Sequence, residues 1–253
     1  MVQLFMDGFQ MPSGESAEII AANGLFIVDR VFNNGQLVAE GCTRVWSGEN
    51  YKIQGFKPMQ EGLNYHLPKI TAPLLRAVEG LFDWVVDTYH SESMALLYYS
   101  PLAPEGLRWQ VRPPKKQSVT GAGIHYEFPE TPRGFSVAGD IHSHTDFNAF
   151  HSGVDEKDEV GKTGLFVTLG HNGSGQRRTI KDYDCSFMIR GRRFTLKPEE
   201  VFEGFEKSEF PDSWKFTVEK ETPPICVGGD DYMGGGIFSS HTKSKKGGGK
   251  WPR

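Results

Sequence analysis

The chain has 253 residues, of which 38% are hydrophobic and 24% charged, and its formal net charge is −4. This is the composition of a globular protein, and the length suits one large domain or one domain with appendages. The small negative charge excludes an overall basic field for nucleic acid, and no apolar stretch reaches the roughly 20 residues of a membrane span. Three widely separated cysteines argue against a disulfide framework or a cysteine-built zinc site. We expect a cytoplasmic protein that binds neither nucleic acid nor a membrane.

Residues 1–68 have the pattern of short strands separated by turns. The strand-like segments are 17–32, 33–41 and 43–48, with turn signals at 23–24 and 33–35. We therefore expect a small β-rich extension at the N-terminal end.

From residue 71 the hydrophobic period becomes that of an amphipathic helix. Apolar residues form one stripe from Leu74 to Tyr89, Thr71 can cap the helix, and Pro73 suits its first turn. A buried strand at 93–100 follows directly, with Glu92 in the junction. Further strands are expected at 107–112, 118–128, 135–141, 165–169, 180–189 and 193–196, and shorter helices at 152–160 and 198–205. This alternation predicts an α/β or α+β fold built on a mixed sheet.

Two histidines stand at the end of one of these strands. His142 and His144 are two residues apart, so the period of a strand turns both imidazoles to the same side. Ser152 and Asp155 follow in the pattern H-x-H-x7-S-x-x-D, and Asp155 would lie in the first turn of the 152–160 helix. Two histidines, one carboxylate and an open fourth position are the ligand set of a catalytic zinc.

Each part of this pattern also has a plain structural interpretation. An H-x-H pair on a strand is usually two polar or core histidines, and Ser152 with Asp155 is also a capping box that needs no metal. Glu92 beside a helix end is most often solvated. The acidic run at 155–159 is by default an exposed helix face. No single part decides between the two interpretations.

Taken together, the parts resemble the JAB/MPN/JAMM metalloprotease family, whose pattern is a glutamate after the first helix and then H-x-H-x7-S-x-x-D. The resemblance covers residues 69–205. It implies a cytidine-deaminase-like mixed β-sheet flanked by helices, with 1–68 as an extension and 206–253 as a C-terminal extension. The end of the latter, from about 228, is Gly/Lys-rich and expected to be mobile. The chain has Thr145 where the family commonly has proline. Within the family it looks most like prokaryotic members, including those of PRTRC-type gene systems.

The resemblance also implies a mechanism and a partner. His142, His144 and Asp155 would bind one Zn²⁺ per chain, Glu92 would act as general acid and base, and Ser152 would stabilise the oxyanion. Asp140 or Asp146 would orient the histidines. The substrate would be an isopeptide or peptide bond after the glycine-ended tail of a ubiquitin-like protein or its conjugate.

Three alternatives belong to other classes. PHP phosphoesterases and metallo-β-lactamase-like hydrolases need more histidines than this chain has after His144. A non-catalytic MPN scaffold in a larger assembly would bind no metal. A third alternative keeps the metal but acts on a small peptide, or on an amino acid attached to a sulfur-carrier-like protein. The sequence does not predict an oligomeric state.

Overall fold

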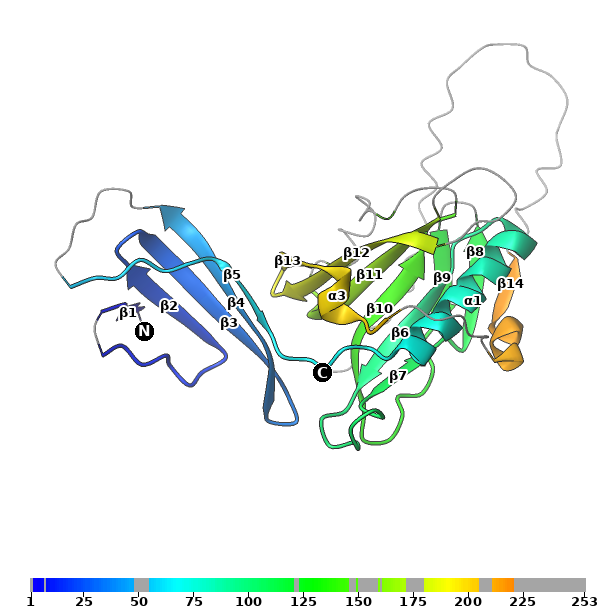
Figure 1. Ribbon diagram of the computed structural model, residues 1–253, viewed down its shortest axis with the longest axis horizontal. Coiled ribbons are helices and arrows are strands. Elements are labelled where there is room, and N and C mark those ends of the chain that lie inside the picture. The colour runs from blue at the N-terminus through cyan, green and yellow to red at the C-terminus, as the bar shows by residue number, and fades with distance from the viewer. Residues whose placement is uncertain are drawn as a thin grey trace, which may run out of the picture.

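The structure is a computed structural model that describes residues 2–6, 8–47, 55–120, 123–145, 149, 159, 161–171, 180–204 and 211–220. Two sheets lie side by side in it, and a long helix crosses one face of the larger sheet (Figure 1). The expected mixed α/β architecture is confirmed. No helix among the described residues has the length and apolar character to cross a membrane.

The N-terminal sheet has five strands in the order β1-β2-β3-β4-β5. Their bounds are β1 Val2–Leu4, β2 Ser16–Ala21, β3 Gly24–Asn33, β4 Gln36–Ser47 and β5 Gly62–Tyr65. The prediction of separate strands at 33–41 and 43–48 was wrong, because β4 runs unbroken through Gly41. Gly41 leaves room for a side chain of the larger sheet: a Cβ would come within 2.6 Å of the Phe194 ring.

The larger sheet has six strands in the order β13-β12-β11-β10-β6-β7. Their bounds are β6 Met94–Tyr99, β7 Trp109–Arg112, β10 Ser136–Ser143, β11 Gly164–His171, β12 Ile180–Ile189 and β13 Arg192–Leu196. β10 and β11 pair in parallel and the other neighbours antiparallel, so the sheet is mixed. β10 lies in the interior of this sheet, and it carries the H-x-H pair to one end.

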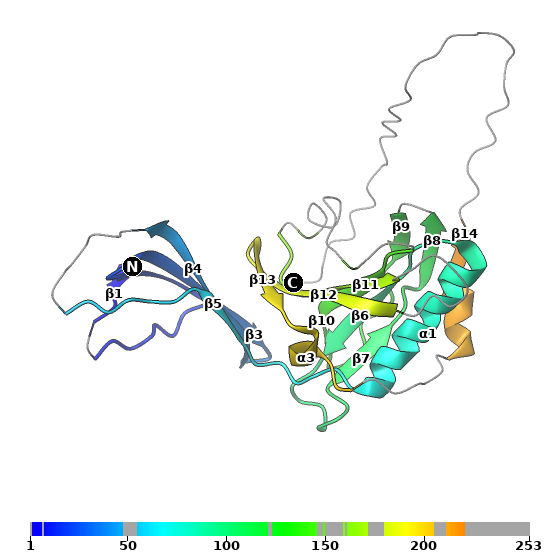
Figure 2. The same cartoon turned by 45° about the horizontal axis from the view of Figure 1, so that its top comes forward.

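Helix α1, Ala72–Tyr89, packs its apolar stripe on one face of the six-stranded sheet (Figure 2). Leu75, Val78 and Phe82 are among its buried residues, together with Ala95 and Leu97 of the facing strand β6. Every residue of β6 is buried, which is the pattern of a strand covered on both faces.

The caps of α1 agree with the sequence expectation in position but not in the hydrogen bond at the N-terminal end. Thr71 occupies the N-cap position, but its side chain makes no capping hydrogen bond, so that prediction was wrong. His90 closes the helix in the left-handed conformation, at φ 51°, and its backbone N–H donates to Val86. The chain then turns through Ser91 and Glu92 into β6.

A third, three-stranded sheet covers the other face around Met94, Leu96 and Tyr98. It consists of β8 Lys116–Thr120, β9 Gly123–Glu127 and β14 Val218–Lys220, in the order β14-β8-β9. The prediction of one strand over 118–128 was wrong, because β8 and β9 are two strands that pair with each other antiparallel. The last helix, α3, is only Pro198–Val201 rather than 198–205, and a 3₁₀ helix, η1, spans Asp212–Thr217.

A polar junction joins the N-terminal sheet to the six-stranded one. Asp29 of β3 is buried and pairs with Arg192 of β13 at 2.5 Å, while Ser16 donates to the same carboxylate. Asn33 donates across the junction to Ser136 at 2.6 Å. Charged and amide groups therefore fix the angle between the sheets.

Candidate functional site

His142 and His144 lie at the C-terminal end of β10. Their ring centroids are 5.5 Å apart, and the ring planes are inclined by 43°. His142 is the penultimate residue of the strand, and His144 follows its last residue. The two imidazoles are therefore neighbours, as the strand period predicts.

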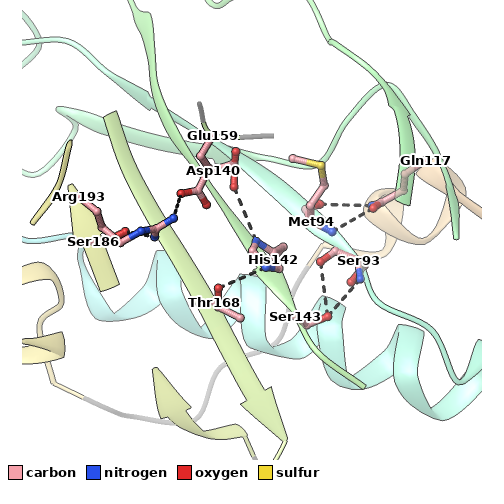
Figure 3. A network of polar contacts seen from close by, with 10 residues as sticks. All are labelled: Ser93, Met94, Gln117, Asp140, His142, Ser143, Glu159, Thr168, Ser186 and Arg193. Atoms are coloured by element: carbon pink, nitrogen blue, oxygen red, sulfur yellow. Dashed lines mark hydrogen bonds and ion pairs between the residues drawn. The ribbon is translucent and has the colours of Figure 1, made fainter. Parts of the chain in front are cut away.

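The ring of His142 is held by polar groups from two strands (Figure 3). Its Nε2 lies 3.2 Å from Thr168 Oγ1 on β11, and its Nδ1 lies 3.8 Å from Asp140 Oδ1 on β10. Asp140 was one of two aspartates that we considered as partners of the histidines. The other, Asp146, lies outside the described residues. A carboxylate behind an imidazole fixes ring orientation and raises ligand basicity.

Glu92 lies at the same end of the sheet. The antiparallel register pairs His142 with Met94, and Ser143 exchanges hydrogen bonds with Ser93. Glu92 immediately precedes Ser93, and His144 immediately follows Ser143. The Glu92 side chain is half-buried in the structure. The sequence places Glu92 only by the order of the elements. In the fold, the pairing of β10 with β6 brings Glu92 to the same end of the sheet as the two histidines.

Ser152 and Asp155 lie outside the described residues, so the structure does not test these two predictions. Glu159, which follows them in the chain, is described, and its carboxylate interacts electrostatically with Asp140 and His142.

Glu159 contradicts the expectation of an exposed acidic face over 155–159. It is 3% exposed and forms an ion pair with Arg193 at 2.5 Å. Arg193 also donates to Ser186 Oγ at 2.7 Å. Burial raises the pKa of Glu159 to about 7; Asp140 adds to that rise, while Arg193 and His142 oppose it. The charged run in the sequence did not reveal that Glu159 is buried and paired, because its partner Arg193 is 34 positions away.

The two imidazoles fit two ligand positions of a zinc ion. Zinc–nitrogen bonds of about 2.0–2.1 Å at the tetrahedral angle put the centres of two bound imidazoles roughly 5 Å apart. The observed separation is 5.5 Å. Within the described part of the chain, no three histidine, cysteine, aspartate or glutamate side chains group as a metal site. Asp155, the third expected ligand, lies outside that part of the chain.

Comparison with protein-family models and with curated proteins finds no match. Among solved structures, the chain is similar to a JAB1/MPN domain protein from Archaeoglobus fulgidus. The two are 17% identical with a TM-score of 0.32, over 54% of this chain and 100% of that one. A likeness with this TM-score assigns neither a family nor a function to the chain.

Proposed function

We propose that the chain is a zinc-dependent isopeptidase or peptidase of the JAB/MPN type, acting on a ubiquitin-like protein or its conjugate. The observation that carries this proposal is the arrangement at the end of β10: two neighbouring imidazoles, with Glu92 two residues before the start of the adjacent strand β6. The motif H-x-H-x7-S-x-x-D adds Ser152 and Asp155 from the sequence.

In this proposal His142, His144 and Asp155 hold one zinc ion. When bound, zinc would polarise the scissile carbonyl and lower the pKa of water from 15.7 towards about 7. Asp140, which lies near Nδ1 of His142, would keep that imidazole oriented, and Nε2, which lies beside Thr168, is the nitrogen left for zinc. Since both imidazoles must be neutral to bind, zinc affinity falls in acid.

Glu92 transfers the proton, and Ser152 stabilises the negative charge that develops on the carbonyl oxygen. The Glu92 carboxylate takes the proton of the attacking water and passes it to the leaving amine, a role worth typically 10²- to 10⁴-fold in rate. The Ser152 hydroxyl donates to the oxyanion that develops from the carbonyl, where one lost donor typically costs about 10²- to 10³-fold. Because the leaving group is an amine, the bond that breaks is an amide.

The substrate class follows from the family resemblance in the motif. A glycine-ended tail of a ubiquitin-like protein would lie extended in the site, and main-chain hydrogen bonds to a strand would hold it. The finer resemblance, to prokaryotic members of PRTRC-type systems, belongs to the same proposal, as does action in the cytoplasm.

The test is incubation of the full chain with candidate ubiquitin-like fusions, followed by intact mass. We expect cleavage after the terminal glycine by the native chain, none by Glu92→Gln, and the same zinc content in both. Glu105→Gln, a change at an exposed glutamate, serves as the control and should keep full activity. Equal activity of Glu92→Gln would remove that residue from the mechanism. A chain that holds no zinc would instead favour the MPN scaffold.

A further inference from the structure

Side chains join the start of β6 to its surroundings at the point where the regular pairing of β6 with β10 stops (Figure 3). We propose that Ser143, the middle residue of H-x-H, and Gln117 of β8 are positioning residues. They hold the backbone that follows Glu92 against the strand that carries the histidines. This inference rests on the proposed function, in which Glu92 transfers the proton, and it concerns only Glu92 and the two histidines of that site.

The first argument is the place of Ser143 in the ladder between the two strands. The last regular pair is His142 with Met94, and one residue further the Ser143 N–H donates to the Ser93 carbonyl at 2.9 Å. The Ser93 N–H donates to the Ser143 hydroxyl at 3.1 Å, and that hydroxyl donates back to the Ser93 carbonyl at 3.4 Å. A side chain therefore continues the ladder at the residue next to Glu92.

The second argument is the amide of Gln117, which binds the next residue of the same segment. The Met94 N–H donates to Gln117 Oε1 at 3.1 Å, and Gln117 Nε2 donates to the Met94 carbonyl at 3.4 Å. Strand β7 pairs with residues 96–99 of β6 and so stops short of Met94. The Gln117 amide offers one acceptor and a donor, as the backbone of a neighbouring strand would.

The third argument is burial, which makes these hydrogen bonds hard to replace. Ser93, Ser143 and Gln117 are each 0% exposed, and Met94 is 4% exposed. A buried backbone N–H that loses its acceptor keeps the full cost of having left water, so the chain moves until the group finds another partner. Loss of either side chain would therefore shift residues 92–94.

Such a shift would change the distance between the proposed general base and the proposed zinc ligands. Glu92 is joined directly to Ser93, and consecutive Cα atoms are about 3.8 Å apart, so a displaced Ser93 carries Glu92 with it. His142 keeps its place because β10 is also paired with β11. A catalytic group that is misplaced by about 1 Å can cost roughly a hundredfold in rate.

Ser93 provides a matched control. Its hydroxyl is buried and has no hydrogen-bond partner among the residues that the structure describes. Its backbone, by contrast, makes the hydrogen bonds to Ser143. Ser93→Ala therefore removes a buried hydroxyl of the same size at the same place and breaks none of these bonds, whereas Ser143→Ala breaks the bond of the Ser93 N–H.

The first measurement is amide hydrogen exchange of the full chain without zinc, resolved by residue. We expect Ser143→Ala to lower the protection of the Ser93 N–H about tenfold, the effect of losing one hydrogen bond, and Gln117→Met to do the same for the Met94 N–H. Ser93→Ala should keep the native protection at both positions. Native protection in Ser143→Ala and Gln117→Met would overturn the inference, whatever the chain catalyses.

The second measurement is steady-state cleavage of the ubiquitin-like fusion that the native chain hydrolyses. Ser143→Ala and Gln117→Met should each lower kcat about 10- to 100-fold while KM and zinc content stay native, because the general base moves and the zinc ligands do not. Ser143→Thr, which keeps a hydroxyl, should recover most of the loss, and Ser93→Ala should keep the native kcat.

Either of the two variants is sufficient if the other does not fold, because they remove different bonds of the same segment. A folded, zinc-loaded Ser143→Ala or Gln117→Met with native kcat would overturn the inference and leave the proposed function intact. A native chain that holds no zinc and cleaves no fusion would overturn the proposed function and, with it, the role of these residues in catalysis.

Discussion

The N-terminal sheet and the six-stranded sheet differ in how much of each strand is buried. Residues of β2 alternate between exposed and buried, whereas all six residues of β6 are buried. The N-terminal sheet also leaves Val45 and Trp46 exposed, at 45% and 51%. Polar side chains gather at one place on the six-stranded sheet: Asp140 and Thr168 are buried beside the partly buried His142, and the buried Glu159 lies near them. This polar cluster is where we place the chemistry.

The largest expected difference between the sheets concerns one glycine in each. At Gly139, φ is +156° and a Cβ would lie 1.7 Å from the Leu165 carbonyl oxygen of the paired strand. Gly139→Ala should lower the free energy of unfolding by about 4 kcal/mol or more, because the backbone cannot move aside. At Gly41 the nearest atoms belong to the Phe194 ring, at 2.6 Å, and a side chain can rotate. Gly41→Ala should therefore cost less stability than Gly139→Ala. Urea unfolding of both variants measures the two free energies of unfolding, and equal losses would contradict this prediction.

The second prediction concerns pH and the six-stranded sheet. The folded-state pKa of Glu159 is raised to about 7 from an ordinary 4.5, so the folded chain holds this proton more tightly than the unfolded chain. Its contribution to stability is therefore present below about pH 4.5 and is lost as the pH rises through about 7, a change of about 2–3 kcal/mol. Glu159→Gln removes the titration. In zinc-free protein, the unfolding free energy of the native chain should fall by that amount relative to that of the variant from pH 5 to pH 8. A constant difference would count against a raised pKa.

The third prediction concerns the junction between the sheets. Asp29→Ala leaves Arg192 without its partner and removes the acceptor of Ser16, which should lower the free energy of unfolding by about 2 kcal/mol. Hydrogen exchange should quicken in β2 and β3 while β6 and β10 stay protected. Faster exchange in all four strands would show that the two sheets unfold as one unit.

The smallest expected effect is the reactivity of a thiol in the N-terminal sheet. Burial raises the pKa of Cys42 to about 11, with smaller contributions from Glu61 and Glu40. In a Cys226→Ser background at pH 8, iodoacetamide should alkylate the Cys42 thiol roughly tenfold more slowly than it alkylates the free thiol of glutathione. The loss of thiolate is partly offset by the greater nucleophilicity of a basic thiol. Cys185 of the six-stranded sheet is buried, and its raised pKa keeps it unreactive. A rate equal to that of glutathione would contradict the raised pKa.

The parts of the fold that local periodicity controls could be predicted from the sequence. The stripe from Leu74 to Tyr89 predicted α1, and the two-residue spacing of His142 and His144 predicted neighbouring rings. Long-range contacts decided the rest. β4 stays unbroken at Gly41 because it pairs there with β3 on one side and with β5 on the other, and β8 and β9 are separate strands because they pair with each other antiparallel.

The candidate site shows the same division. The H-x-H pair and the junction at Glu92 are visible as a local pattern, and the register of β10 with β6 brings them together. Burial of Glu159 could not be predicted, because a carboxylate in a charged run gives no sign of an arginine that only the fold brings to it. Asp140 was visible in the sequence as a candidate partner of the histidines, but its closeness to His142 is seen only in the fold.

The central claim is that two imidazoles and Asp155 share one zinc ion. Crystals of the native chain, grown with zinc and measured on either side of the zinc absorption edge, test it most directly. The account predicts one anomalous peak per chain at about 2.0–2.2 Å from a nitrogen of His142, a nitrogen of His144 and a carboxylate oxygen of Asp155. A map without a peak between the two rings, or a peak there with the Asp155 carboxylate turned away, would contradict it.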